Sequence, residues 1–288
     1  MSPFKSHIPI LLLSLLLLSY CGLNAQQKKL RVLSYNVLKG LQGDVKNMNR
    51  FSCWVKKKSP DIICYQEMNG FTQKSLENFA IGYGHPYAMI AKESGYSVAI
   101  TSRFPIVNAQ KVLENMWHGY LYANINGLHV FAIHLSPFLY QKRLHEIRQI
   151  LAQAALLPKA SPVLIAGDFN SYQARDSGYY SEKALLTQQS REQKNAEIRN
   201  LNAGKFDYSV TNEGTTAGFK DAVSLFSKQF DFSMPTKKYD AAFKDKIRID
   251  YIWLNKSLQR KATAASVVYD DDTADMSDHY PILLDLNY

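Results

Sequence analysis

The stretch that decides the fold is Val163–Asn170, "VLIAGDFN", in which four apolar residues run into a glycine, a carboxylate, an aromatic ring and an amide. A run that is apolar on both alternating faces is typical of a strand buried on both sides. Gly167 has no Cβ and gives the backbone room to turn. Strand alternation directs Phe169 into the core, away from Asp168 and Asn170. The stretch therefore predicts a buried strand that presents a carboxylate and an amide at its end.

Similar apolar runs recur along the chain and alternate with segments of helical period. The segments that read as strands are 30–37, 61–67, 96–102, 119–127, 128–135, 162–170, 248–255 and 280–288. The segments that read as helices are Asn47–Lys57, Ser75–Phe79, Tyr140–Leu157 and the polar stretch Ser181–Leu201, which we interpret as a surface insertion. Asn126-Gly127 is a strong hairpin signal. The pattern predicts a multilayer α/β protein without an internal domain boundary.

Residues 1–25 have the layout of a secretory signal peptide, which is removed in the mature protein. A lysine precedes the apolar run Ile8–Leu18, and Ala25 supplies a small residue at the cleavage position. The run is too short to span a membrane as a mature helix, and the bulky residue before Cys21 disfavours lipidation there. We therefore expect cleavage near Ala25, a catalytic domain over residues 26–288, and a secreted or periplasmic location.

The chain has 288 residues and a net formal charge of +9. This length suits one large α/β domain. The basic balance favours an anionic partner, such as nucleic acid, a phospholipid surface or a phosphorylated metabolite, without choosing among them. Export would permit a disulfide between Cys53 and Cys64. Because one lies in a predicted helix and the other in an apolar run, we expect two buried free thiols instead.

Polar side chains recur where the predicted strands begin or end. Each one alone has an ordinary structural explanation, such as a turn residue, a helix cap or a hydrogen-bonded core histidine. The ends of buried strands can converge on one edge of a sheet, where ligand sites usually form. The set as a whole therefore predicts a site, and its members are Asn36, Glu67, His134, Asp168, Asn170, Asp250, Asp278 and His279.

The order and spacing of seven segments resemble the endonuclease/exonuclease/phosphatase superfamily, which includes pancreatic-type deoxyribonuclease, apurinic-site endonuclease and sphingomyelinase. The segments are "SYNV", "DIICYQE", "AITSRFPI", "FAIHLSP", "LIAGDFN", "RIDYIWLN" and "SDHYPI", and they run from residue 34 to residue 282. The resemblance implies an α/β (α+β) fold, a four-layer sandwich of two face-to-face mixed β-sheets flanked by helices. It also implies divalent-metal-dependent hydrolysis of phosphate esters.

A phosphodiester repels hydroxide and has a poor leaving group, so its hydrolysis needs a cation on the phosphate oxygens, a base and hydrogen-bond donors. The resemblance places Glu67 and Asn36 at the metal. Glu67 is a hard carboxylate of the kind that Mg²⁺ prefers, and Asn36 would support the metal or orient its shell through its amide carbonyl. Asp278 is a further metal ligand or an orienting acid. We expect Mg²⁺ as the cofactor, with Mn²⁺ or Ca²⁺ as alternatives.

The remaining five residues are assigned to catalysis. Asp168 would orient or deprotonate the attacking water, and Asn170 can donate to a phosphoryl oxygen, as an ionised aspartate could not. His279 would contact the phosphate as a donor or act as a general base, with Asp250 holding its tautomer and raising its pKa. The resemblance assigns His134 to the phosphate or to protonation of the leaving oxygen.

One feature departs from the pancreatic-type pattern, in which a glutamate orients the histidine at the position of His134. The comparable place here falls near Tyr96, and Glu93 is expected in a loop. The orienting partner of His134 is therefore open. We interpret His118 as a packed or exposed strand histidine, with a place at the edge of the site as the alternative.

The expected function is an exported metal-dependent phosphodiester hydrolase that is nuclease-like. The alternatives are a phosphomonoesterase of inositol-phosphate type and a phospholipid headgroup hydrolase with the same site. A non-catalytic binding module is disfavoured because the whole set of site residues is present. The expected partner is an anionic phosphoester, with nucleic acid among the candidates, and a monomer without an obligate protein partner is favoured. Substrate preference is expected in loops such as Ser171–Gly218.

Overall fold

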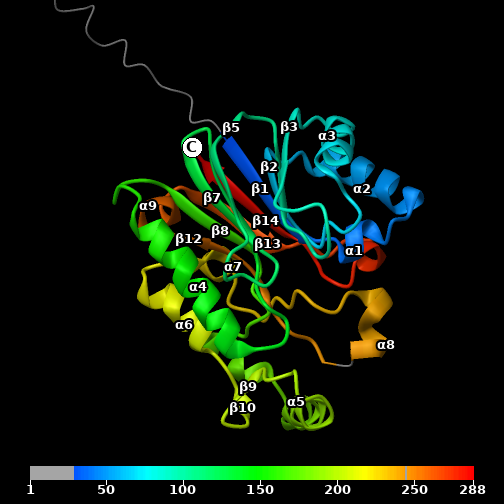
Figure 1. Cartoon of the computed structure of the whole chain (residues 1–288), viewed down its shortest axis with the longest axis vertical. Coiled ribbons are helices and arrows are strands. Elements are labelled where there is room, and N and C mark those ends of the chain that lie inside the picture. Colours follow the sequence, from blue (N-terminus) through cyan, green and yellow to red (C-terminus); the bar gives the residue numbers. More distant parts are fainter. Residues whose placement is uncertain (1–28, 244) are drawn as a thin grey trace, which may run out of the picture.

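The computed structural model describes residues 29–243 and 245–288, so the expected signal peptide, Cys21 and the cleavage position near Ala25 lie outside the described residues. Two six-stranded mixed sheets face each other, and helices cover their outer faces (Figure 1). This is the four-layer α/β sandwich that the resemblance implied. No helix in the described part of the chain is long and apolar enough to cross a membrane.

The first sheet has the strand order β13-β14-β1-β2-β4-β3. Its strands are β1 (Lys29–Asn36), β2 (Ile62–Gln66), β3 (Tyr87–Ile90), β4 (Ala99–Ser102), β13 (Ala262–Val267) and β14 (Ile282–Asn287). The helices beside it are α1 (Leu38–Leu41), α2 (Val45–Lys58), α3 (Gln73–Ile81) and α10 (Thr273–Met276). Asp44 caps α2 by accepting from the Lys46 N–H, and Phe51 and Trp54 of α2 pack against Tyr35 of β1. The side chains on one stripe of α2 thus seal one face of this sheet.

The second sheet has the strand order β11-β12-β8-β7-β6-β5. Its strands are β5 (Ile106–Val112), β6 (Tyr120–Ile125), β7 (Leu128–His134), β8 (Val163–Asp168), β11 (Lys220–Asp221) and β12 (Asp250–Leu254). Its apolar outer face packs against α4 (Tyr140–Ala155) and α6 (Ser209–Thr216). Asn126 and Gly127 have φ values of 54° and 84°, which is the left-handed geometry of a tight hairpin turn. The predicted hairpin between β6 and β7 is confirmed.

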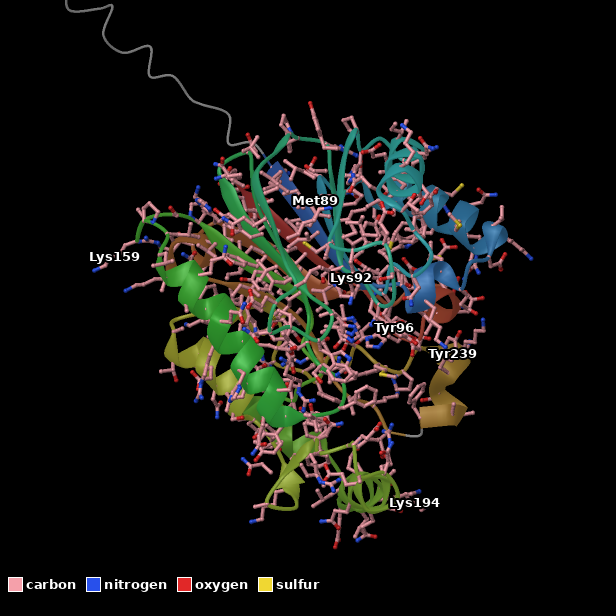
Figure 2. The ribbon with its side chains drawn as sticks, in the orientation of Figure 1. Met89, Lys92, Tyr96, Lys159, Lys194 and Tyr239 are labelled. Atoms are coloured by element: carbon pink, nitrogen blue, oxygen red, sulfur yellow. The ribbon has the colours of Figure 1, made fainter. Side chains whose placement is uncertain are left out.

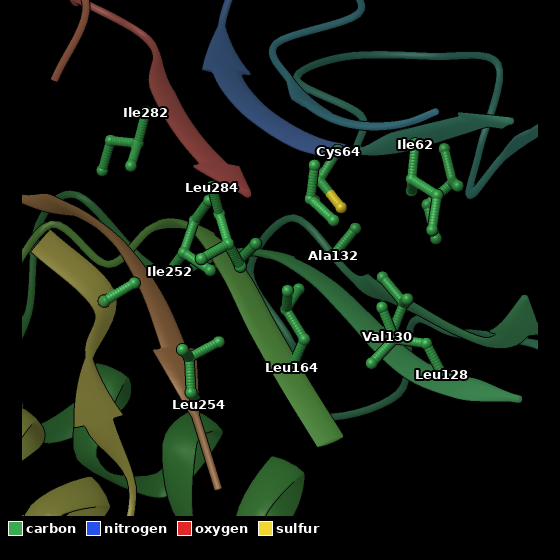
Figure 3. Close-up of a cluster of buried hydrophobic side chains, with 14 of the residues drawn as sticks. Ile62, Cys64, Leu128, Val130, Ala132, Leu164, Ile252, Leu254, Ile282 and Leu284 are labelled. Carbon is green, nitrogen blue, oxygen red and sulfur yellow. The ribbon is translucent and has the colours of Figure 1, made fainter. Parts of the chain in front are cut away.

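A continuous apolar core fills the space between the two sheets (Figure 3). Cys64 of β2 lies in this core as a buried free thiol, as expected. Cys53 is also free, but it is exposed on α2. The expectation that it is buried was wrong, because the stripe of α2 that faces the sheet carries Phe51, Trp54 and Val55 and turns Cys53 to solvent.

The prediction that strands are buried on both faces is confirmed for three strands and is wrong for a fourth. Every residue of β2, β8 and β12 is buried. In β14, however, buried and half-buried residues alternate, and Asp285 pairs with Arg31 of β1 on the more open face at 2.6 Å. An isolated carboxylate inside an apolar run thus marks a face that no layer fully covers.

The predicted helix over Ser181–Leu201 is shorter in the structure, where α5 spans Glu182–Lys194. Ser181 caps its first turn, and Glu192 accepts from the Asn200 N–H and so draws the following loop back onto the helix. With the short strands β9 (Leu201–Asn202) and β10 (Lys205–Phe206), α5 projects at the end of the molecule farthest from α3 (Figure 1). Lys194, at the end of α5, is labelled there in Figure 2.

The remaining short elements connect the layers. They are the 3-10 helices η2 (Ala174–Tyr179) and η3 (Lys237–Tyr239), and the helices α7 (Ala222–Phe226), α8 (Asp240–Phe243) and α9 (Lys256–Gln259). Arg248, just before β12, is buried and pairs with Asp176 of η2 and with Asp221. These ion pairs fasten the segment that enters β12 to the elements around it.

Candidate active site

The two sheets meet through polar side chains at the ends of β1 and β8. The Asn36 side chain donates from Nδ2 to Asp168 Oδ2 at 3.1 Å and to Glu67 Oε1 at 3.3 Å. Glu67 follows β2 with a φ of 61°, and its other oxygen accepts from the Lys39 N–H. The predicted convergence of strand ends is therefore present, and it joins one sheet to the other.

The end of β8 is shaped by a close approach to β7. A Cβ on Gly167 would lie 1.9 Å from the carbonyl oxygen of Ile133, so only glycine lets the two strands pair at this point. Asp168 Oδ1 then accepts from the Asn170 N–H at 2.8 Å, and Asn170 Nδ2 donates to the Leu135 carbonyl at 3.0 Å. One amide hydrogen of Asn170 is used in this way, which leaves the second for a ligand.

Phe169 between these two residues is fully buried, and its ring packs against that of Trp253 of β12, with the ring centroids 4.4 Å apart. The prediction that it belongs to the core is confirmed. This packing anchors the turn that carries Asp168 and Asn170.

Asp250 and His279 form a close pair beside Asp168. Asp250 lies directly opposite Asp168 in the β12–β8 ladder, and the His279 Nδ1–H donates to Asp250 Oδ2 at 2.8 Å. His279 Nε2 lies 3.9 Å from Asp168 Oδ2 and 3.9 Å from an oxygen of Asp278. Its outer nitrogen is thus free to face a ligand while the inner one is held.

Burial and crowding of like charges set the protonation of these groups. Burial, and then the neighbouring Asp250, raise the pKa of Asp168, and burial also raises the pKa of Glu67. Burial alone would lower the pKa of His279, but the carboxylates of Asp250 and Asp278 outweigh it and raise that pKa well above 6.5. His279 is therefore the cation of the cluster near neutral pH.

A divalent cation fits this donor set. Four carboxylates, those of Glu67, Asp168, Asp250 and Asp278, surround a single imidazolium, and oxygens of Asp168 and Asp250 lie within 4.8 Å of one another. Glu67 is half-buried, with no basic side chain bonded to its oxygens among the described residues. An excess of buried and half-buried negative oxygens is the environment that hard cations such as Mg²⁺ stabilise.

The orientation of Asn36 differs from the expectation that its carbonyl would serve the metal. The Asn36 Oδ1 accepts from the Leu38 N–H, while its NH₂ group faces Glu67 and Asp168. Two neighbouring carboxylates are acceptors, so the amide donates to them. In this orientation the amide contacts Glu67 and Asp168 through its NH₂ group, as an orienting residue would.

His134 also lies in the cluster, with Nε2 3.5 Å from Asp168 Oδ2. Its ring stacks on that of His118, with centroids 4.1 Å apart and planes 17° from parallel. Its Nδ1 atom has no hydrogen-bond partner among the residues that the structure describes. Glu93 accepts from the Gln73 N–H instead, so no described carboxylate reaches Nδ1 of His134, and the neighbour on its ring face is His118.

His118 is a site residue that sequence reasoning set aside, although a signal was present. In the β6–β7 hairpin, Tyr120 pairs with Ile133. Counting back from the Asn126-Gly127 turn therefore places His118 beside the end of β7. Burial, and then the charge of Lys92, lower the pKa of His118 to about 3. Burial also lowers the pKa of His134 well below 6.5, so both stacked rings are neutral.

Two buried residues of α4 hold the loops that follow β7 and β8, and no sequence pattern indicated their role. Arg143 donates to Ser171 Oγ at 2.9 Å and to the Ser136 carbonyl at 3.0 Å. Glu146 accepts from the backbone N–H groups of Ser136 and Trp117. Their charges look like an ordinary exposed helix face, and only the tertiary structure buries them.

Comparisons with known proteins agree with this geometry. The sequence pattern of the endonuclease/exonuclease/phosphatase family matches residues 33–279. A search of curated protein sequences finds no match.

Solved structures share the fold at low identity. An AP endonuclease from Archaeoglobus fulgidus is 18% identical with a TM-score of 0.67, and the match covers 90% of this chain and all of that one. The 3'-5' exonuclease NExo from Neisseria meningitidis is 16% identical with a TM-score of 0.67 over 90% of this chain and 100% of that one. TDP2 from D. rerio, complexed with single-strand DNA product, is 17% identical with a TM-score of 0.61 over 91% and 100%.

The family match extends over most of the chain and includes every strand end that contributes to the cluster, while the solved structures show the same sandwich. The chain therefore belongs to the endonuclease/exonuclease/phosphatase family and is a metal-dependent hydrolase that acts on phosphate esters.

Proposed function

We propose that this protein is a nuclease-like phosphodiester hydrolase. The observation that carries the proposal is the buried cluster in which Asp168 lies between the Asn36 amide and the Asp250–His279 pair. In this arrangement, Asp168 accepts a proton from the attacking water. The raised pKa of His279 keeps it protonated, so it donates to a phosphate oxygen rather than acting as a base.

The other residues complete the site. The remaining amide hydrogen of Asn170 donates to a phosphoryl oxygen, and the neutral His134 ring faces the leaving oxygen. Glu67 and Asp278 would hold the cation, and Asn36 would orient the Glu67 carboxylate. A bound Mg²⁺ would neutralise charge on the phosphate oxygens; Mn²⁺ and Ca²⁺ are the alternative ions.

Nucleic acid is the substrate class that we propose. Two of the solved structures that share the fold hold DNA products, NExo with a product DNA hairpin and TDP2 with a single strand. The net charge of +9 suits a polyanion. Monoester hydrolysis and phospholipid headgroup hydrolysis are the outcomes that would replace this proposal.

We also propose that the protein is exported, on the strength of the leader-like residues 1–25. Sequencing the amino terminus of the protein recovered outside the cytoplasm would test this. A start near residue 26 is expected, and an intact first residue would contradict it.

The central experiment measures hydrolysis of bis(p-nitrophenyl) phosphate and then of plasmid DNA, RNA, sphingomyelin and inositol phosphates. We expect activity with Mg²⁺ or Mn²⁺, loss with EDTA and recovery when the metal is restored. Asp168→Asn and His279→Ala should each lower kcat by about 10²-fold or more. The exposed residues Asp271 and His145 supply matched controls, D271N and H145A, which should retain full activity. Turnover that survives EDTA, or none on any phosphoester, would refute the proposal.

A further inference from the structure

A cavity of about 200 Å³ opens beside Asn170, next to the active site. Its walls come from the loop after β7, from α5 and the loop that follows it, and from the segment that leads into β12. A smaller cavity of about 60 Å³ shares the side chains of Tyr172, Gln188 and Arg191 with it. Far more room is present than the roughly 10–15 Å³ that one water needs, so a ring-sized group fits.

The chemistry of the walls narrows the class of ligand. Most lining side chains are apolar or aromatic, among them Phe138, Tyr172 and Ile249. The polar ones among the described lining residues are three amides and one guanidinium, Arg191, and no carboxylate is present there. A polyphosphorylated ring would need several cations, and the described lining offers one, Arg191. The same guanidinium repels a quaternary ammonium headgroup, which the aromatic faces would otherwise attract.

Gln188 supplies the second observation. Its Oε1 atom is buried and has no hydrogen-bond partner within the described part of the chain, while its Nε2 donates to the Tyr172 hydroxyl at 3.5 Å. A buried carbonyl oxygen without a donor is destabilising unless a water or a ligand satisfies it. The missing partner is an N–H or O–H group that enters the cavity between apolar walls.

Asn200 limits what the polar wall can do. Its Oδ1 accepts from Arg143 and its Nδ2 donates to the Pro137 carbonyl, so both ends of its amide are already used. Gln188 Oε1 is therefore the buried acceptor of this wall that has no partner among the described residues, and Arg191 is the cation available to lie over a ring or to reach an anionic oxygen.

We propose that this cavity binds the nucleobase of the nucleotide whose phosphate is held at Asp168 and His279. A nucleobase is flat and apolar on its faces and carries N–H donors on its edge, which matches the aromatic walls and the unpaired oxygen of Gln188. The inference rests on the proposed function for the position of the phosphate. It adds that α5, the surface insertion, selects substrates that carry a base.

Binding and cleavage are measured separately to test this. Calorimetry on the whole protein with Mg²⁺ compares deoxyadenosine 5′-monophosphate with deoxyribose 5-phosphate, which lacks the base. We expect the base to tighten binding by about 10-fold. Gln188→Met keeps the size of the side chain but removes the acceptor, and should abolish most of this preference without changing the affinity for deoxyribose 5-phosphate.

The matched control is Gln189→Met on the same helix. Gln189 donates to the Gly204 carbonyl and lines neither cavity, so this variant should keep the wild-type preference. Ile198→Trp, which fills the cavity from its wall, should weaken binding of the nucleotide but not of the sugar phosphate. Equal affinity of the wild-type protein for the two ligands, or an unchanged preference in both Q188M and I198W, would overturn the inference.

The p-nitrophenyl esters of the same two phosphates distinguish this failure from that of the proposed function. If both esters are cleaved at equal rates, the phosphodiesterase proposal stands and the base pocket is wrong. If neither is cleaved but the nucleotide still binds more tightly through Gln188, the pocket stands and the proposed reaction is wrong. A trinucleotide compared with the mononucleotide ester then shows whether the base comes from a polymer or a free nucleotide.

Discussion

At the scale of single residues, the His279 imidazole shows how the sequence around a residue fails to reveal its state. Burial favours its neutral form, yet two carboxylates keep it charged. A raised pKa means that the protonated form persists to higher pH than in a free histidine. If His279 donates to the phosphate, activity is therefore present below its pKa in the folded protein and declines as the pH rises through it.

Asp250→Asn tests this directly. The substitution removes the carboxylate that raises the pKa of His279 most, so the alkaline limb of kcat/KM should move to lower pH, with a lower rate at every pH. The pH–rate profile on bis(p-nitrophenyl) phosphate provides the measurement, with D271N as the control. An alkaline limb that stays in place would exclude His279 as the proton donor.

Gly167 illustrates a steric requirement at one position. A methyl group there would collide with the Ile133 carbonyl oxygen at 1.9 Å, and β7 and β8 would have to separate. We expect Gly167→Ala to lower the free energy of unfolding by about 2 kcal/mol or more. Urea denaturation measures the change, and Gly178→Ala, where the added Cβ meets no atom within 4 Å, should stay within about 0.5 kcal/mol of wild type.

At the scale of elements, α4 acts as a support for the two catalytic loops. Arg143 reaches the residue after Asn170 and the second residue after His134, and burial lowers its pKa to about 10. A lysine could keep the charge but could not make the forked set of hydrogen bonds.

Arg143→Lys should therefore lower kcat by about 10-fold through misplacement of Asn170, with a smaller effect on KM. Steady-state kinetics and thermal melts on the same samples separate misplacement from unfolding. Arg148→Lys is the control, because Arg148 pairs with Glu213 on the exposed side of the same helix. A wild-type kcat in R143K would show that α4 does not position the loops.

At the scale of the whole molecule, buried neutral histidines should make stability depend on pH. His85 bridges Thr101 of β4 and the Pro60 carbonyl before β2, and burial lowers its pKa to about 4. Below pH 6.5 the unfolded chain binds the proton more readily than the folded one. The contribution of His85 is thus fully present above about 6.5 and is lost as the pH falls toward 4.

The expected loss is about 3 kcal/mol from this group alone. Urea unfolding between pH 8 and pH 4.5 measures the slope, and His85→Asn should flatten it. H145A, which changes an exposed histidine, should leave the slope unchanged. An identical slope in H85N and the wild-type protein would mean that other groups cause the acid sensitivity.

The sequence by itself predicted a multilayer α/β protein and, through the family resemblance, the sandwich and the polar residues at the strand ends, but not His118. A local apolar run in the sequence predicts each buried strand. The polar residue at the strand's end can be read from the sequence without knowing which residues lie next to it in space. Strands without such a run, such as β5, where most residues are exposed, left no local signal and were not predicted. The exposure of Cys53 was also not predicted, because the helical period does not show which stripe of α2 packs against the sheet.

Only the tertiary structure decided how those residues act on one another. The stack of His118 on His134, the position of Arg143 beneath the loops and the cavity between α5 and Asn170 join segments far apart in the chain. The hydrophobic periodicity of a segment indicates how much of that segment is buried, because burial depends on the segment's own apolar surface. Partner choice depends on strand register and on the packing of both sheets, and no single segment contains that information.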